Sequence, residues 1–138
     1  MTRQLGRLLA ILSLCYLGLC YLAAPVLAHH GFETEYDRAK EVKLTGVVTK
    51  IEWTFPHMRL YVDVTDEKGA VTNWNLEMRT PNDYVRTGWK KSDLLPGEKV
   101  VFEAYGGKVI ESRGQLRSVV KVGQTTPLFI GDRPDTLQ

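Results

Sequence analysis

Apolar and polar residues alternate along most of the chain after residue 41, and this pattern predicts β-strands. The first run covers residues 42–53, with Gly46 at a place where a strand could bend sharply. A second run covers residues 57–64 and a third covers residues 70–78, joined by a predicted hairpin turn at residues 66–69. The side chains predicted to face the core are Val42, Leu44 and Val48 in the first run, Met58, Leu60, Val62 and Val64 in the second, and Thr72, Trp74, Leu76 and Met78 in the third.

The period changes after the third run. Thr80 is a candidate N-cap, Pro81 suits the first helical position, and Gly88 marks a stop, so a helix of about two turns is predicted here. After a Pro-Gly turn, alternation returns at residues 99–105 and again at residues 115–122. These two stretches are predicted to be the fourth and fifth strands.

Three strands, a short helix and two further strands are the element order of an OB-fold. The predicted fold class is therefore all-β with one short helix, arranged as a five-stranded OB-like partly open barrel. An SH3-like barrel and a small β-sandwich are the alternatives. A short edge strand is also predicted at residues 128–130.

The first 28 residues have a different character. A basic start with Arg3 and Arg7 leads into a long uncharged apolar run that ends in Val26-Leu27-Ala28. This order is typical of a secretory signal peptide cleaved after Ala28. The prediction is a periplasmic or secreted protein with no membrane association after cleavage, and the alternative is an uncleaved signal that anchors the chain in the inner membrane.

Composition restricts the chemistry of the remaining chain. Both cysteines, Cys15 and Cys20, lie in the predicted signal, so the part after residue 28 can form no disulfide or thiolate metal site. The predicted signal holds two of the 18 basic residues and none of the 16 acidic ones, so the rest carries 16 of each. This balance argues against nucleic acid as a partner, because that binding depends on neutralising phosphates. The predicted organisation is a signal peptide at 1–28, an N-terminal arm at 29–41, an OB-like barrel at 42–124 and a C-terminal tail at 125–138.

Several short motifs follow one another along the chain: a His-His pair, a Glu-Trp-x-x-Pro-His segment, a Trp-x-x-Glu strand, and an Arg-x-Gly-Trp segment before a Pro-Gly turn. In these motifs the chain resembles a family of small exported bacterial proteins of unknown function, and the resemblance implies kinship without an activity. The chain departs from the family pattern at Phe55, where that pattern has asparagine. The matching positions are His29, His30, Glu52, Trp53, Pro56, His57, Trp74, Glu77, Arg86, Gly88, Trp89, Leu94 or Leu95, Pro96 and Gly97.

The histidines are the candidate metal ligands. Cleavage after Ala28 would give a chain that starts with His29 and His30, and His57 is the only other histidine. A terminal histidine offers its α-amino group and a ring nitrogen, and a third nitrogen from His57 would complete a site suited to Cu(II). Glu77 could serve as an outer ligand or orient a histidine. The alternative is that the three histidines are polar residues with structural roles only.

The outward positions of the second and third strands form a mixed polar face with one aromatic residue. This face suits a small polar ligand or a protein partner, and the sequence shows no nucleophile elbow, phosphate loop or paired-carboxylate signature. The leading prediction is therefore a non-enzymatic exported binding module, and the alternative is a copper-binding protein. The candidate ligand-binding residues are Arg59, Tyr61, Asp63, Asn73, Asn75 and Glu77.

Overall fold

The computed structural model describes residues 30–130. Contacts divide the chain into two units, Met1–Thr34 and Glu35–Gln138, and the strands found among residues 30–130 belong to the second. The predicted signal peptide and its cleavage site lie outside the described residues. Between residues 30 and 130, no helix is long and apolar enough to cross a membrane.

Two short helices and six strands make up the described chain. Their order agrees with the pattern of alternating runs, except that helix α2 lies in the predicted N-terminal arm, where the sequence pattern indicated no element. The elements are α2 (His30–Glu35), β1 (Tyr36–Glu52), β2 (Arg59–Thr65), β3 (Val71–Glu77), α3 (Pro81–Arg86), β4 (Lys99–Gly107), β5 (Arg113–Lys121) and β6 (Phe129–Ile130).

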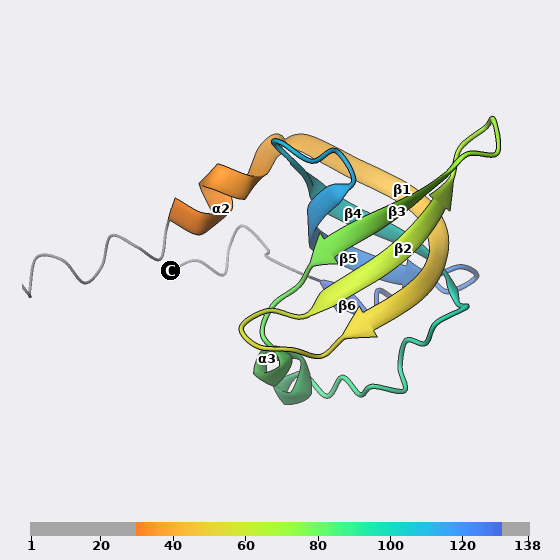
Figure 1. The fold of residues 1–138 in the computed structure, drawn as a ribbon. Helices are drawn as coiled ribbons and strands as arrows, with labels where there is room; N and C mark the ends of the chain where they lie inside the picture. Colours follow the sequence, from red (N-terminus) through yellow and green to blue (C-terminus); the bar gives the residue numbers. More distant parts are fainter. Residues whose placement is uncertain (1–29, 131–138) are drawn as a thin grey trace, which may run out of the picture. The chain divides into compact units, whose positions relative to one another are not determined.

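The first five strands form a ring. They are hydrogen-bonded in the order β3-β2-β1-β4-β5, and a parallel pairing between β3 and β5 joins the two ends (Figure 1). All other pairings are antiparallel, including that of β6 with the outer edge of β5. The predicted fold class is confirmed, since an all-β ring with a short helix between its third and fourth strands is consistent with an OB-like partly open barrel.

The core fills the inside of this ring with most of the side chains predicted for it, but Thr72 of β3, which was predicted to face the core, is exposed. Met58, just before β2, and Leu60 and Val62 of β2 are fully buried, and Phe102 of β4 and Val119 of β5 belong to the same core cluster. The alternation along β2 therefore separates one inward face from one outward face, as the sequence predicts. Trp74 is only partly buried and packs on Phe102, with ring centroids 5.8 Å apart.

Strand β1 is longer than the sequence indicated and pairs on both sides. It starts at Tyr36 rather than at residue 42, pairs with β4 along its first part and with β2 along its second. The register shifts between Val48 and Lys50, so the inward parity passes from Val48 to Ile51. Gly46 is not the site of that bulge. A Cβ at Gly46 would instead collide with the carbonyl oxygen of Asp63, which requires glycine there for close strand approach.

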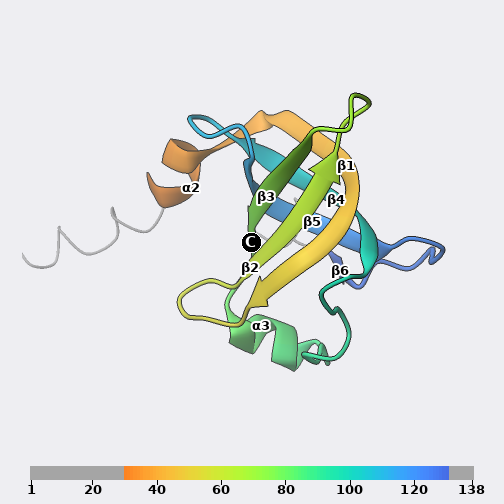
Figure 2. The ribbon, with the colours of Figure 1, turned by 45° about the vertical axis from the view of Figure 1, so that its right-hand side comes forward.

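Helix α3 lies across one end of the ring (Figures 1 and 2). Its Tyr84 is buried and contacts Trp89, with ring centroids 5.1 Å apart, and Phe129 of β6 at 4.6 Å. Thr80 is the N-cap residue as predicted, but its side chain makes no capping hydrogen bond. The burial of Tyr84 thus does more to fix this short helix than its cap does.

Candidate functional site

The six predicted ligand-binding residues lie on one outward face of β2 and β3. The register places Arg59 opposite Glu77, Tyr61 opposite Asn75, and Asp63 opposite Asn73. These are three successive cross-strand pairs on the same side of the sheet. In an OB-fold, the face of the second and third strands is where ligands commonly bind.

Glu77 lies at one end of this face and has the largest number of polar contacts there. Its side chain is 14% exposed, and its carboxylate is contacted by polar groups from β1, β2 and the loop between them. Arg59 Nη2 lies 3.2 Å from Oε2, Tyr36 OH donates to the same oxygen at 2.9 Å, and His57 Nδ1 lies 2.7 Å from Oε1. We call Tyr36, His57, Arg59 and Glu77 the Glu77 cluster.

Tyr36 joins the cluster from the start of β1. Its side chain is 2% exposed, so its hydroxyl must find a partner inside the protein, and Glu77 supplies it. Burial, and then the hydrogen bond to Glu77, raise the pKa of Tyr36 well above its usual value. Tyr36 therefore remains a hydrogen-bond donor to Glu77 throughout the physiological range.

His57 stands in the loop between β1 and β2, where two neighbours fix the backbone. Met58, which is fully buried, exchanges backbone hydrogen bonds with Met78 and Arg79, and Thr54 Oγ1 donates to the His57 carbonyl oxygen at 3.3 Å. The imidazole is half-exposed and its Nδ1 donates to Glu77. The other nitrogen, Nε2, has no partner among residues 30–130, so it is the atom that can bind a donor or a metal ion.

Arg59 links the cluster to the next cross-strand pair. Its Nη1 donates to Asn75 Oδ1 at 3.0 Å while Nη2 contacts Glu77. The guanidinium thus bridges two side chains of β3 from its place on β2. This double contact holds Arg59 in one orientation at the end of the face.

The remaining face residues form two smaller groups with β1. Tyr61 OH donates to Glu52 Oε2 at 3.0 Å, and Lys50 forms an ion pair with the same carboxylate. These contacts, with that from Lys50 first, lower the pKa of Glu52. Asn73 Nδ2 donates to Asp63 Oδ1 at 2.6 Å and to a hydroxyl of β1. The face therefore consists of three adjacent groups of side chains, and the members of each group are hydrogen-bonded to one another.

Only some of the predicted copper ligands lie within the described residues. His29 lies outside the described residues, and so does the side chain of His30, whose backbone begins α2. The described part of the chain contains no group of three His, Cys, Asp or Glu side chains able to hold a metal ion. His57 and Glu77 are in contact, as a metal-bound histidine and its orienting carboxylate usually are.

Sequence reasoning missed Tyr36, which it assigned to the N-terminal arm, and did not place Glu52 on the polar face. A tyrosine between charged residues gives no alternating signal, and the bulge between Asp37 and Glu41 interrupts the pattern that leads back from the core positions of β1. Glu52 reaches the face because the second bulge of β1 reverses its parity. Neither bulge contains a glycine or proline that would indicate its position in the sequence.

Other residues of the shared motifs have structural surroundings. Trp53 stacks on Trp89 with ring centroids 5.6 Å apart, and Gly88 and Gly97 have positive φ angles of 86° and 91°. Phe55 is 67% exposed, so the departure from the family pattern falls on the surface, two residues before His57 in the sequence. Packing therefore accounts for these two tryptophans, and the positive φ angles of turns account for these two glycines.

The fold and the site together define a small β-barrel protein with an ordered polar face on β2 and β3. The chain belongs to a family of unknown function, DUF6152, whose sequence pattern matches residues 18–117. No curated protein and no solved structure is significantly similar to it.

Proposed function

We propose that the protein is an exported, non-enzymatic binding module that takes a small polar ligand or a protein partner on the face of β2 and β3. The observation that carries the proposal is the Glu77 cluster, in which three donors from β1, β2 and the loop between them converge on one carboxylate. Side chains already held in place lose little freedom when a ligand binds. Mutual hydrogen bonding of this kind supports recognition by fixed groups rather than proton transfer by a free one.

The test is an NMR titration of the ¹⁵N-labelled protein, produced from the full sequence in an exporting bacterial host. The probes are three classes of small polar compound: amino acids, dicarboxylates and disaccharides. A ligand of the proposed site shifts amides within residues 57–63 and 73–77 and binds at least tenfold more weakly to His57→Ala and Tyr61→Ala. Lys43→Ala, on the opposite outer face, is the matched control and keeps full affinity. Shifts confined to other surfaces, or equal affinity in all variants, would contradict the proposal.

A copper-binding function is the second candidate, and the His57–Glu77 contact favours it. Because Nδ1 donates to the carboxylate, Nε2 is left as the metal-binding nitrogen in a fixed orientation. The proposed ligands are the amine and ring of His29, with His30 nearby in sequence, together with His57. Copper would be bound for storage or delivery.

Intact mass of the exported protein decides whether this set of ligands can exist. A chain that starts at His29 should bind Cu(II) stoichiometrically with a type-two cupric spectrum. Affinity should then fall sharply in His57→Ala, and also when one glycine is inserted before His29. A different N-terminus, or affinity that neither change alters, would show that any bound copper is adventitious.

A further inference from the structure

A groove lies between the second half of β1 and the segment that leads from α3 to β4, away from the Glu77 cluster. Its volume is about 460 Å³, within the range of small-molecule sites. Its lining is mainly apolar, with five apolar and three polar residues. The lining residues are Thr49, Lys50, Ile51, Trp53, Lys91, Leu94, Leu95 and Pro96.

The apolar wall is fixed by packing with the core. The Trp53 ring stacks on Trp89, and Leu94 is 1% exposed. Leu95, by contrast, is 49% exposed at the open side. The groove therefore has a rigid inner surface and an accessible apolar edge. The apolar part of a ligand of modest length can be removed from water against them.

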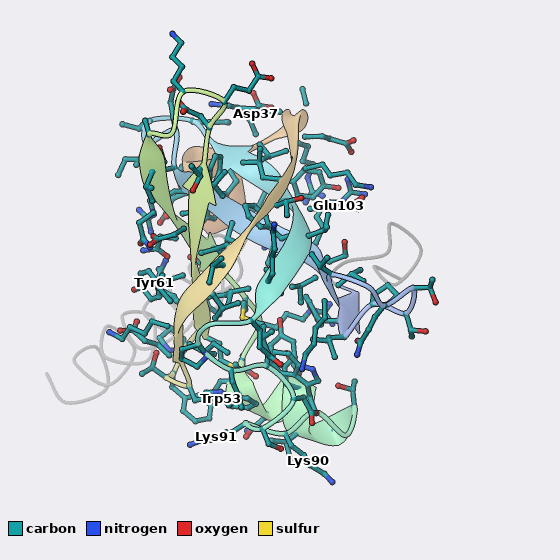
Figure 3. All side chains as sticks on the ribbon, turned by 90° about the vertical axis from the view of Figure 1, so that its right-hand side faces the viewer. Asp37, Trp53, Tyr61, Lys90, Lys91 and Glu103 are labelled. Atoms are coloured by element: carbon teal, nitrogen blue, oxygen red, sulfur yellow. The ribbon has the colours of Figure 1, made fainter. Side chains whose placement is uncertain are left out.

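The charged side chains that line the groove are all positive. Two lysines and no carboxylate are among its lining residues. Lys50 is already paired with Glu52. Lys91 is exposed, its Nζ lies 5.8 Å from the centre of the Trp53 ring, and no carboxylate pairs with it in the described part of the chain (Figure 3). One positive charge is thus left without a counter-ion beside an apolar surface.

We propose that this groove binds a single-chain alkyl carboxylate of medium length. The alkyl chain would lie against Trp53 and Leu95, with the carboxylate at Lys91. A groove of this size suits one chain rather than a two-chain lipid. The cations that line it are lysines, which act as point charges. A carboxylate carries the single negative charge that Lys91 can neutralise.

The test is titration of the ¹⁵N-labelled protein, produced from the full sequence, with decanoate below its micelle concentration. Decanol, butyrate and decyl phosphate are the comparison probes. Decanoate should shift amides of residues 49–53 and 91–96 and bind more tightly than decanol or butyrate, because it alone combines a long chain with one carboxylate. Lys91→Gln should weaken decanoate binding by roughly fivefold, the size of a partly exposed ion pair, and leave decanol binding unchanged.

Matched variants separate the site from general effects of charge and hydrophobicity. Lys68→Gln removes an exposed lysine from the β2–β3 turn, and Val71→Ser removes an exposed apolar side chain from β3. Both should bind decanoate like the parent protein, whereas Leu95→Ser should weaken it. Equal binding of decanol and decanoate, stronger binding of decyl phosphate with the same dependence on Lys91, or shifts confined to the β2–β3 face would each overturn the proposal.

Discussion

The outer face of β2 and β3 and the outer face of β1 and β4 are both lined with polar side chains, yet they are built differently. On the first, Glu77 is 14% exposed and receives three donors. On the second, the central pair is Lys43 with Glu103, whose side chains are 69% and 39% exposed. Polarity alone therefore does not distinguish a candidate site from ordinary solvated surface. The features that distinguish the candidate site are the burial of its acid and the convergence of several donors on that acid.

Removing the acid from each face should give the largest difference between the two. Glu77→Ala removes the carboxylate that the Tyr36 hydroxyl and Arg59 Nη2 contact, and we expect a loss of about 2–3 kcal/mol in the free energy of unfolding. Urea denaturation at neutral pH measures this loss. Glu103→Ala is the matched change, with an expected loss below about 0.5 kcal/mol. Similar losses in the two variants would mean that the Glu77 cluster is no different from the opposite face.

Tyr36→Phe should have the next largest effect. It removes a hydrogen bond to a charged group, which is worth about 1.5–2 kcal/mol at neutral pH. Because burial raises the folded-state pKa of Tyr36, its contribution is fully present below the unfolded pKa of about 10 and is lost as the pH rises beyond it. Stability curves above pH 10 should therefore be flatter in Tyr36→Phe than in the parent protein. An unchanged alkaline slope would show that Tyr36 titrates as it does in the unfolded chain.

His57→Ala should cost less than either change, below about 1 kcal/mol, because its ring is half-exposed and Glu77 keeps two other donors. The more specific readout is the imidazole tautomer, observed by ¹⁵N NMR in the parent protein. We expect the proton on Nδ1 in the parent protein and a mixture of tautomers in Glu77→Ala. A proton mainly on Nε2 in the parent protein would contradict the orientation that the copper proposal requires.

Lys43→Met tests the opposite face and should have the smallest effect, below about 0.5 kcal/mol. The hydrogen bond from Lys43 is the main cause that lowers the pKa of Glu103. The contribution of this pair is therefore present above the unfolded pKa of glutamate, about 4.3, and is lost as the pH falls through the folded value. Salt at about 1 M should remove most of it. A larger effect that resists salt would make this face an organised site as well.

The sequence predicts the barrel well because its period-two signal is strong where side chains are fully buried. Met58, Leu60 and Val62 alternate with polar residues, and all three are in the core. The outward face follows from the same alternation, which is why the sequence alone places Arg59 and Glu77 on one face. Pairing by alternation needs only the backbone period of a strand.

The rest of the site depends on features that leave no such trace. Tyr36 contacts Glu77 across 41 positions of sequence, and two bulges in β1 set the side on which each of its residues emerges. A hydrogen bond over that distance is decided by how the ring closes, not by local pattern. His57 could be named as a candidate, but its pairing with Glu77 depends on a loop anchored by Met58.

The parallel join of β3 and β5 is the shortest in the ring, with only three residue pairs: Asn75 with Arg113, Leu76 with Gly114, and Glu77 with Gln115. Amide protons along this seam should accordingly exchange with solvent sooner than those between β2 and β3. Glu77 belongs to both this seam and the polar face. A ligand that binds the Glu77 carboxylate should therefore also stabilise the pairing of β3 with β5 that closes the ring. Slower deuterium uptake at residues 75–77 and 113–115 would then report occupancy of the face, even for a ligand that is spectroscopically silent.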